Sequence, residues 1–274
     1  MEPAAIASGG LARGVVMTTI DDLLAIMVKL RDPATGCAWD KAQTYQTIVP
    51  YTLEEAYEVA DAIERGAIAE LKDELGDLLF QVVFYSQIGA ELGDFQFADC
   101  VAAICDKLVR RHPHIFAKSE QHADAATALQ NWEALKQAER QLSGLPSVLD
   151  NVPQGLPALT RAYKLQKRCA NVGFDWPDVA GCWDKVKEEI LEVEQTSPGS
   201  AELADELGDL MFALVNVIRK SGLEPEAVLR QANRKFERRF RAVEQTLASS
   251  ETPVGQASLE QMEAAWQLVK QQQG

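Results

Sequence analysis

The feature that most constrains the fold of this chain is an internal duplication. The segment DELGDLLFQVVF at residues 73–84 returns as DELGDLMFALVN at residues 205–216. A chain of 274 residues has room for two domains of about 100 residues each, with a tail and a linker besides. The sequence therefore predicts two tandem domains built to the same plan.

Apolar residues recur with helical spacing in both copies, and no segment has the alternation of a strand. Helices are expected in the first copy at residues 20–30, 53–64, 68–92 and 97–111, and in the second at 157–170, 181–195, 201–220, 225–247 and 258–272. Thr52 is expected to be the N-cap of the helix at 53–64, with Glu55 completing a capping box. The predicted fold class is all-α, with two helical bundles in tandem.

Helix breakers and composition place the expected domain boundaries. Three prolines and two glycines between residues 143 and 157 predict the interdomain linker there. The N-terminal helical domain is then expected at residues 20–142 and the C-terminal one at residues 158–274. Residues 1–19 lack the apolar core of a signal peptide and are expected to form a disordered tail.

Charge and cysteine usage exclude several classes of partner. The net charge of −14 argues against nucleic acid or an anionic membrane as the main partner. It does not exclude an anionic small substrate, because a bound cation inverts the local field. No run of 18 or more apolar residues is present, so no transmembrane helix is expected. Five cysteines without a CxxC pair fit reduced thiols, and the expected location is the cytoplasm.

Each copy carries two pairs of acids, and the two acids of a pair stand three residues apart, which places them on one face of a helix. The pairs are Glu189 with Glu192 and Glu206 with Asp209 in the second copy, and Glu55 with Glu58 and Glu74 with Asp77 in the first. If the two helices of a copy pack side by side, four carboxylates converge and need a cation to offset their repulsion. Oxygen ligands of this kind favour Mg²⁺, with Mn²⁺ as a substitute, over Zn²⁺.

An acidic helix face is often only a solvated surface, which is the alternative interpretation of any one pair. The recurrence of all four acids in both copies favours a metal site instead. Gly76 and Gly208 lie inside the second acid pair of each copy. A glycine inside a helix costs about 1 kcal/mol relative to alanine, so these two predict the close approach of another group.

Basic residues also recur at matching places. Lys107 and Arg111 in the first copy, and Lys235 and Arg239 in the second, stand four residues apart and form a two-pronged cationic clamp. The alternative is an ordinary surface solvated by nearby acids, and the recurrence favours the binding of an anion. Metal-bound acids with a basic clamp are suited to phosphate chemistry. With no histidine or P-loop beside the acids, the sequence favours hydrolysis by a metal-activated water.

Two loops containing a tryptophan also match each other. Ala38-Trp39-Asp40 precedes the acids of the first copy, and Phe174-Asp175-Trp176 precedes those of the second. The first of these loops is either a turn anchored by its tryptophan or a lip of the site, and the second matches it in position and composition. The sequence leaves both interpretations open.

These motifs together resemble the MazG family of all-α nucleoside triphosphate pyrophosphohydrolases. The phrases that carry the resemblance are GCAWDKAQT, PYTLEEAYEV, DELGDLLFQVVFYSQ and RRHPHIF in the first half, and RAYKLQKR, VGFDW, DELGDLMFALVN and ANRKFERRF in the second. The similarity spans about residues 20 to 270 and is to the full-length, two-domain type. It implies helical bundles that dimerise and Mg²⁺-dependent hydrolysis of a nucleoside triphosphate to the monophosphate and pyrophosphate.

The resemblance also implies roles for individual residues. The metal ligands would be Glu189, Glu192, Glu206 and Asp209, with Glu188 beside them as a candidate base. Lys185, Lys235 and Arg239 would contact the triphosphate, and Trp266 would be an aromatic residue on the nucleobase side of the substrate. The equivalents in the first copy are Glu55, Glu58, Glu74 and Asp77, with Glu54, Lys107 and Arg111. In two-domain relatives the C-terminal unit is the one expected to carry activity.

Two alternatives to a general pyrophosphohydrolase with a housecleaning role stay open. One is a narrow-specificity dUTP or dCTP diphosphatase on the same bundle, because loop geometry, and not motif spacing, sets base selectivity. The other is a helical protein that senses a nucleotide without turnover. A homodimer acting on nucleoside triphosphates, without nucleic acid or membrane partners, is the expected assembly.

Overall fold

The computed structural model describes residues 19–116, 146–250 and 252–273, together with isolated positions between 124 and 144. Every regular element within these residues is a helix, which confirms the predicted all-α class. The tail expected at residues 1–19 lies almost wholly outside the described residues. None of the described helices is both long and apolar enough to cross a membrane.

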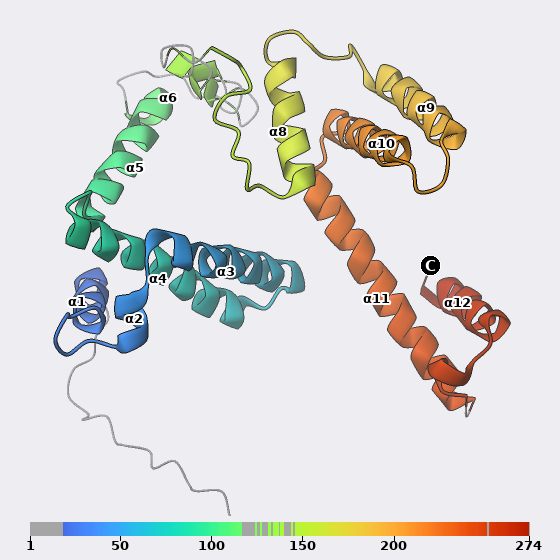
Figure 1. The fold of residues 1–274 in the computed structure, drawn as a ribbon, viewed down its shortest axis with the longest axis horizontal. Helices are drawn as coiled ribbons and strands as arrows, with labels where there is room; N and C mark the ends of the chain where they lie inside the picture. Colours follow the sequence, from blue (N-terminus) through green and yellow to red (C-terminus); the bar gives the residue numbers. More distant parts are fainter. Residues whose placement is uncertain are drawn as a thin grey trace, which may run out of the picture. The chain divides into compact units, whose positions relative to one another are not determined.

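The chain divides into two compact units, which we name the first unit (residues 1–139) and the second unit (residues 140–274). Each contains one copy of the repeated segment, within α4 (Ile68–Leu92) of the first and α10 (Ala201–Lys220) of the second (Figure 1). The prediction of two tandem helical domains is therefore confirmed. Residues 146–157, the described part of the expected linker, form turns without a helix.

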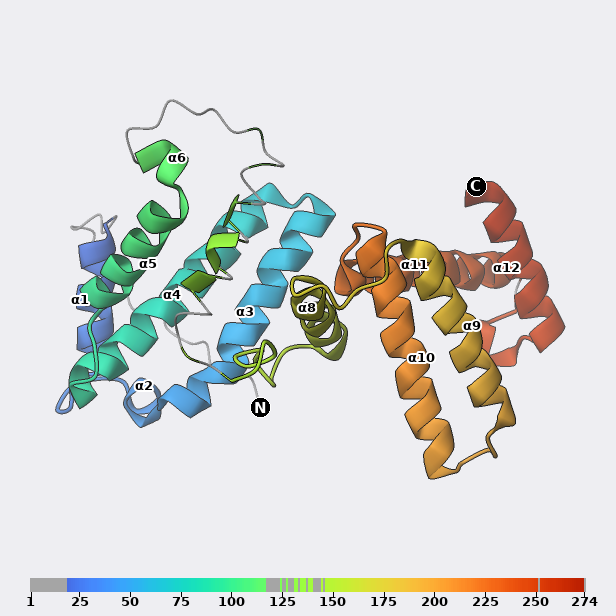
Figure 2. The same ribbon diagram turned by 90° about the horizontal axis from the view of Figure 1, so that it is seen from above.

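The first unit is built around a pair of long helices. Its described elements are α1 (Ile20–Leu30), α2 (Ala38–Ala42), α3 (Tyr45–Arg65), α4, α5 (Phe97–Arg111) and α6 (Pro113–Phe116). α3 and α4 run alongside each other (Figure 2), joined by a tight turn in which Gly66 takes the left-handed φ of 69°. This pairing places the acids of α3 next to those of α4.

The start of α3 differs from the prediction. The N-cap of this helix is Thr44, so the capping box expected at Thr52 and Glu55 is wrong. Thr52 lies inside the helix, where its hydroxyl donates to the Ile48 carbonyl at 3.2 Å. Ile48 is 1% exposed, and the burial of its side chain outweighs the tendency of Pro50 to break the helix.

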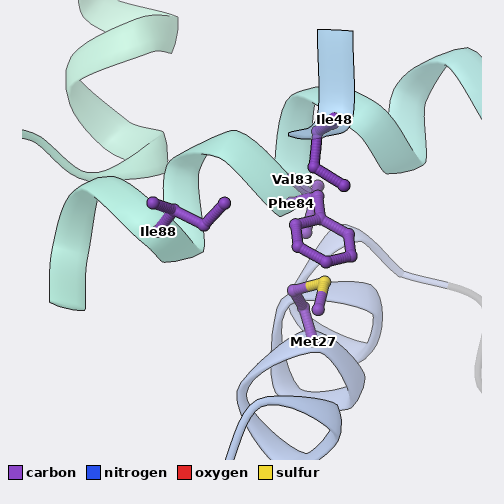
Figure 3. Packing of buried hydrophobic residues seen from close by; sticks show 5 residues of the cluster. All are labelled: Met27, Ile48, Val83, Phe84 and Ile88. Atoms are coloured by element: carbon purple, nitrogen blue, oxygen red, sulfur yellow. The ribbon is translucent and has the colours of Figure 1, made fainter. Parts of the chain in front are cut away.

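The core of the first unit joins α1, α3 and α4. Its fully buried members are Met27 from α1, Ile48 from α3, and Val83, Phe84 and Ile88 from α4 (Figure 3). Phe84 is the largest of these side chains and has no exposed surface. This contact holds α1 and the start of α3 against the middle of α4.

A buried arginine fixes the segment around Trp39. The guanidinium of Arg31 donates to Glu91 Oε1 at 2.9 Å and to Glu91 Oε2 at 2.7 Å, which lowers the pKa of Glu91 below its ordinary value. The same group donates to the backbone carbonyls of Asp40 and Gln43. Residues 38–42 therefore form the short helix α2 rather than the expected loop.

The second unit repeats the pair of long helices. Its elements are α8 (Ala158–Ala170), α9 (Val179–Gln195), α10, α11 (Pro225–Ser249), the 3₁₀ turn η1 (Val254–Gln256) and α12 (Leu259–Gln273). All five expected helices are confirmed, with ends that differ from the prediction by two residues at most. α9 packs along α10, α8 contacts α10, and α12 packs on α11.

Candidate active site

Three acids of the second unit come together where α9 packs on α10. One carboxylate oxygen from each of Glu189, Glu206 and Asp209 lies within 4.8 Å of the others. Glu189 belongs to α9, and the other two belong to α10. The two helices are held together by a small buried core of Cys182, Val186, Ala213 and Val217.

Glu189 is the most buried of the three acids, with 2% of its surface exposed. Its Oε1 accepts a hydrogen bond from Lys185 Nζ at 2.6 Å, whereas its Oε2 has no hydrogen-bond partner among the described residues. An unsatisfied buried polar atom costs about 1–3 kcal/mol, and more when it is charged. A cation at the acid cluster would supply the partner that Oε2 lacks.

Lys185 links two neighbouring acids of α9. Its ammonium lies 2.8 Å from Glu188 Oε1 and 2.6 Å from Glu189 Oε1. Hydrogen bonds to Glu188 and then to Glu189 raise the pKa of Lys185 above its ordinary value, so the side chain is cationic at neutral pH. The structure thus places the predicted triphosphate ligand Lys185 and the candidate base Glu188 directly at the acid cluster.

The fourth predicted ligand of this unit, Glu192, lies outside the group of three acids. Burial raises the pKa of its carboxyl, and the charge of Glu189 raises it further. Glu192 stands one helical turn beyond Glu189 on α9. The structure therefore brings three of the four predicted ligands together and places the fourth within electrostatic reach.

The first unit has a related cluster with a different composition. There the three acids with oxygens within 4.8 Å of one another are Glu55, Glu58 and Glu74. Asp77 lies outside the group. The pKa of Glu55 is raised chiefly by burial and next by the negative charge of Asp77. Burial, followed by the charge of Glu58, likewise raises the pKa of Glu74.

The residue four positions before the first acid distinguishes the two copies. In the second unit this residue is Lys185, and in the first it is Tyr51, which is 38% exposed. Tyr51 contacts the edge of the Trp39 ring with centroids 5.6 Å apart. Position 51 thus does not supply the first cluster with an ammonium as Lys185 supplies the second, a difference that the spacing of the acids alone did not reveal.

A cavity of about 670 Å³ adjoins the acids of the second unit. Lys185, Glu189 and Asp209 line it. The remaining lining comes from Leu149, α8, α10 and the loop at 171–177, and it combines aromatic and aliphatic side chains with a few polar ones. Trp176 is part of this lining, so its loop borders the cavity that the acids line.

The loop at 171–177 is held to α10 and α9 by specific contacts. Asp175 pairs with Arg219 and, at 3.1 Å, with Lys220. Burial acts to raise the pKa of Asp175, but the bonds to Arg219 and Lys220 together outweigh it, so the pKa lies below its ordinary value. Gly181 of α9 allows the Trp176 ring to approach closely, because a Cβ at this position would stand 2.7 Å from Cε3 of the ring. Sequence reasoning did not single out Arg219, which carries no motif of its own.

The residues of the basic clamp lie in surroundings that differ from those of the acids, in both units. In the first unit, Arg111 Nη2 lies 2.5 Å from Glu139 Oε2, and Lys107 is exposed on α5. In the second unit, Lys235 is exposed on α11, and Arg239 is half-buried with its Nε lacking a hydrogen-bond partner among the described residues.

The ring of Trp266 on α12 lies beside that of Phe236 on α11, with centroids 5.6 Å apart and the planes tilted by 45°. It packs against the buried cluster that joins these two helices. The lining of the acid-bearing cavity includes neither Trp266 nor the clamp residues Lys235 and Arg239. Within one chain, the structure therefore separates these three predicted residues from the carboxylates.

Comparison with known proteins agrees with the motif resemblance. The family model described as the MazG nucleotide pyrophosphohydrolase domain matches residues 43–116, and the model for phosphoribosyl-ATP pyrophosphohydrolase matches residues 173–236. Both matched segments contain acids of the respective cluster. The two halves of the chain are thus each similar to a pyrophosphohydrolase domain.

Relatives match almost the whole chain. The "Nucleoside triphosphate pyrophosphohydrolase" of Escherichia coli (strain K12) is 53% identical over 261 residues, covering 94% of this chain and 99% of that protein. The "Nucleoside triphosphate pyrophosphohydrolase/pyrophosphatase MazG" of Thermotoga maritima is 36% identical over 250 residues, covering 91% and 95%. YabN of Bacillus subtilis (strain 168) is 43% identical over 250 residues, covering 90% of this chain and 50% of that protein. The chain belongs to the MazG family of nucleotide pyrophosphohydrolases.

Proposed function

We propose that this pyrophosphohydrolase cleaves ribo- and deoxyribonucleoside triphosphates to the monophosphate and pyrophosphate, with Mg²⁺ held by the acids of the second unit. The names of the E. coli and T. maritima relatives support the substrate class. The observation that carries the metal assignment is the unpartnered, buried Oε2 of Glu189 within a cluster of three carboxylates. Removal of surplus or damaged nucleotides is the role that such an activity would serve.

The donor set fits a hard divalent cation. Glu189, Glu206 and Asp209 offer carboxylate oxygens within 4.8 Å of one another, and Glu192 stands beside them. Oxygen donors of this kind suit Mg²⁺ and Mn²⁺. When bound, the cation would neutralise negative charge on the phosphate oxygens and lower the pKa of a bound water.

The charged side chains around the acids have distinct roles in this proposal. The Lys185 ammonium, which bonds to Glu188 and Glu189, is close enough to the acids to stabilise negative charge on the leaving pyrophosphate. Glu188 has a side chain that is 57% exposed and is the candidate to accept the proton of the attacking water. Tyr51 occupies in the first unit the position that Lys185 occupies in the second. We therefore assign the turnover to the second unit.

Product analysis tests this function. Several NTPs and dNTPs are incubated with the protein, with Mg²⁺ or with a chelator, and pyrophosphate and orthophosphate are measured separately. Monophosphate and pyrophosphate in equal amounts, lost on chelation, are the expected products. Orthophosphate would show that a different bond is cut, and stoichiometric binding without product would support the sensing alternative. Turnover of only dUTP or dCTP would support the narrow-specificity alternative.

We further propose that the protein works as a homodimer. Apolar side chains at helical spacing remain 38% to 54% exposed on the acid-bearing helices: Leu75, Leu79 and Val82 on α4, and Leu207, Met211 and Leu214 on α10. The close approach expected at Gly76 and Gly208 is absent within the described residues, where nothing lies within 4 Å of a Cβ built at either position. A second copy packed on these faces would cover both features, and it could bring Lys235 and Arg239 to the acids of its partner.

A charge placed on this face tests the dimer. Met211→Lys is expected to convert a dimer into a monomer, because a lysine ammonium in an apolar interface has to be desolvated. Light scattering coupled to size-exclusion chromatography measures the mass. Leu259→Lys is the control, since Leu259 is 76% exposed and belongs to α12, not to an acid-bearing helix. A wild-type protein that is monomeric and fully active would contradict the proposal.

A further inference from the structure

The cavity beside the second unit's acids has the dimensions and lining of a ligand site. Its volume of about 670 Å³ falls within the range of about 300–1,000 Å³ that is typical of small-molecule pockets. Leu165, Phe174, Trp176 and Phe212 supply apolar and aromatic surface, and Lys185, Glu189 and Asp209 of the acid site line the same cavity. One molecule with an anionic end and a flat, apolar end could therefore fill it.

Gln166 of α8 presents a fixed hydrogen-bond acceptor in this lining. The residue is 7% exposed, and its Nε2 donates to the Phe212 carbonyl at 2.8 Å. Because only the amide nitrogen can donate to a carbonyl, this bond fixes the orientation of the amide. The other amide atom, Oε1, is buried without a hydrogen-bond partner among the described residues.

Asn216 of α10 presents the opposite polarity. Its Oδ1 accepts from Arg219 Nη2 at 2.7 Å and from Arg219 Nε at 3.1 Å. Arginine is a donor only, so Oδ1 must face it, and Nδ2 is the atom of Asn216 that can donate elsewhere. Arg219 is itself held by Asp175, so the orientation of Asn216 is set by an ion pair.

Residues along one face of α10 show in which direction a ligand could extend from the acids. Asp209, Phe212 and Asn216 stand at intervals of three and four residues, so they share one face of the helix. Asn216 is seven residues beyond Asp209, a rise of about 10 Å. A nucleotide with its phosphates at Asp209 could thus extend along this face toward Asn216 and Gln166.

We propose that this cavity binds the nucleobase, and that Gln166 Oε1 and Asn216 Nδ2 read its edge as acceptor and donor. This inference rests on the proposed function, since the phosphates must lie at the acids of the second unit. Within one chain, Trp176 supplies aromatic surface to this cavity. The base would also supply the hydrogen-bond partner that the buried Gln166 carbonyl lacks among the described residues.

A buried glutamine with an unpartnered oxygen is not by itself a site. Gln81 of the first unit is 5% exposed and has the same unpartnered Oε1. Gln166 differs because it shares a cavity with Lys185, Glu189 and Asp209. Gln81 therefore provides the matched control for the loss of a buried glutamine amide.

The first test is a Gln166→Met variant, assayed by pyrophosphate release with ATP, GTP, CTP and UTP. Loss of one hydrogen bond is expected to raise KM about three- to tenfold, with kcat changed less than twofold. The KM ratios among the four nucleotides are expected to change, since the four base edges differ. Gln81→Met is expected to leave KM and these ratios as in the wild type.

Two results would overturn the inference. One is an unchanged KM in Gln166→Met, and the other is an equal rise for all four nucleotides, which would mean a structural role without base contact. If the wild-type protein itself releases no pyrophosphate, it is the proposed function that fails.

Asn216→Asp is the second variant and keeps the shape of the side chain. The aspartate still accepts from Arg219 but replaces the Nδ2 donor with an acceptor. The order of preference among the four nucleotides is expected to change, with thermal unfolding within about 2 °C of the wild type, because exposed or paired substitutions are nearly neutral. An unchanged order of preference would contradict the role of Asn216 as donor, whatever the result with Gln166→Met.

Discussion

Glu189→Gln is expected to lower kcat/KM for nucleoside triphosphate hydrolysis by about 1,000-fold. The substitution keeps the size of the side chain but removes the charge of the most buried acid in the cluster. A neutral amide is a weak ligand for Mg²⁺, and the charge stabilisation that a bound metal provides is worth several kcal/mol, where each 1.36 kcal/mol is about tenfold in rate. Half-saturation is also expected to require more Mg²⁺ than in the wild type.

The matched control is Glu55→Gln, the same change at the equivalent acid of the first unit. It is expected to leave kcat/KM within about threefold, because Tyr51 stands in the first unit at the position of Lys185 and the turnover is assigned to the second unit. Steady-state kinetics at several Mg²⁺ concentrations compares the two variants, and circular dichroism shows whether each is folded. Full activity in Glu189→Gln would contradict the metal assignment, whereas a loss only in Glu55→Gln would move the active site to the first unit.

Phe84→Ala is expected to destabilise the first unit by about 3–5 kcal/mol, the usual cost of removing a large aromatic ring from a core. Phe84 has no exposed surface and packs with Met27, Ile48 and Ile88 from three helices (Figure 3). It also lies beneath the Arg31 guanidinium, 5.4 Å from the ring centroid, and at the edge of the Trp39 ring. The cavity left by the ring would therefore loosen α1, α2 and the start of α3 together.

Urea unfolding followed by circular dichroism measures this effect. Each described buried cluster lies within one unit, so the transition of the first unit is expected to move to lower urea while that of the second stays in place. Phe116→Ala is the control, because Phe116 is 59% exposed in the same unit, and a shift below about 0.5 kcal/mol is expected. Equal destabilisation by both variants would show that Phe84 is not part of a specific core.

The sequence by itself determined the fold class, the duplication and the family. The acid spacing, the repeated DELGD segment and the helix periodicity are local patterns, and a helix expresses local patterns directly because its neighbours in space are three and four residues away in sequence. For the same reason, the bounds of α4, α5 and α10 agree with the prediction to the residue. The acids of each pair of helices were expected to converge, and three of the four in each unit do.

Only the tertiary structure decided which residues surround the acids. α3 begins after the N-cap Thr44, which forms a local capping box with Thr47, but only the packed structure shows that the helix continues through Pro50 with Ile48 buried against α4. Gln166 and Asn216 carry no motif, and they become a candidate base site only because α8 and α10 place both in the lining of one cavity with Glu189. Lys235, Arg239 and Trp266 match the family by sequence, yet α11 and α12 place them outside that cavity. Spacing along one helix fixes a face, whereas the contacts between helices far apart in the sequence depend on how complete side-chain surfaces pack.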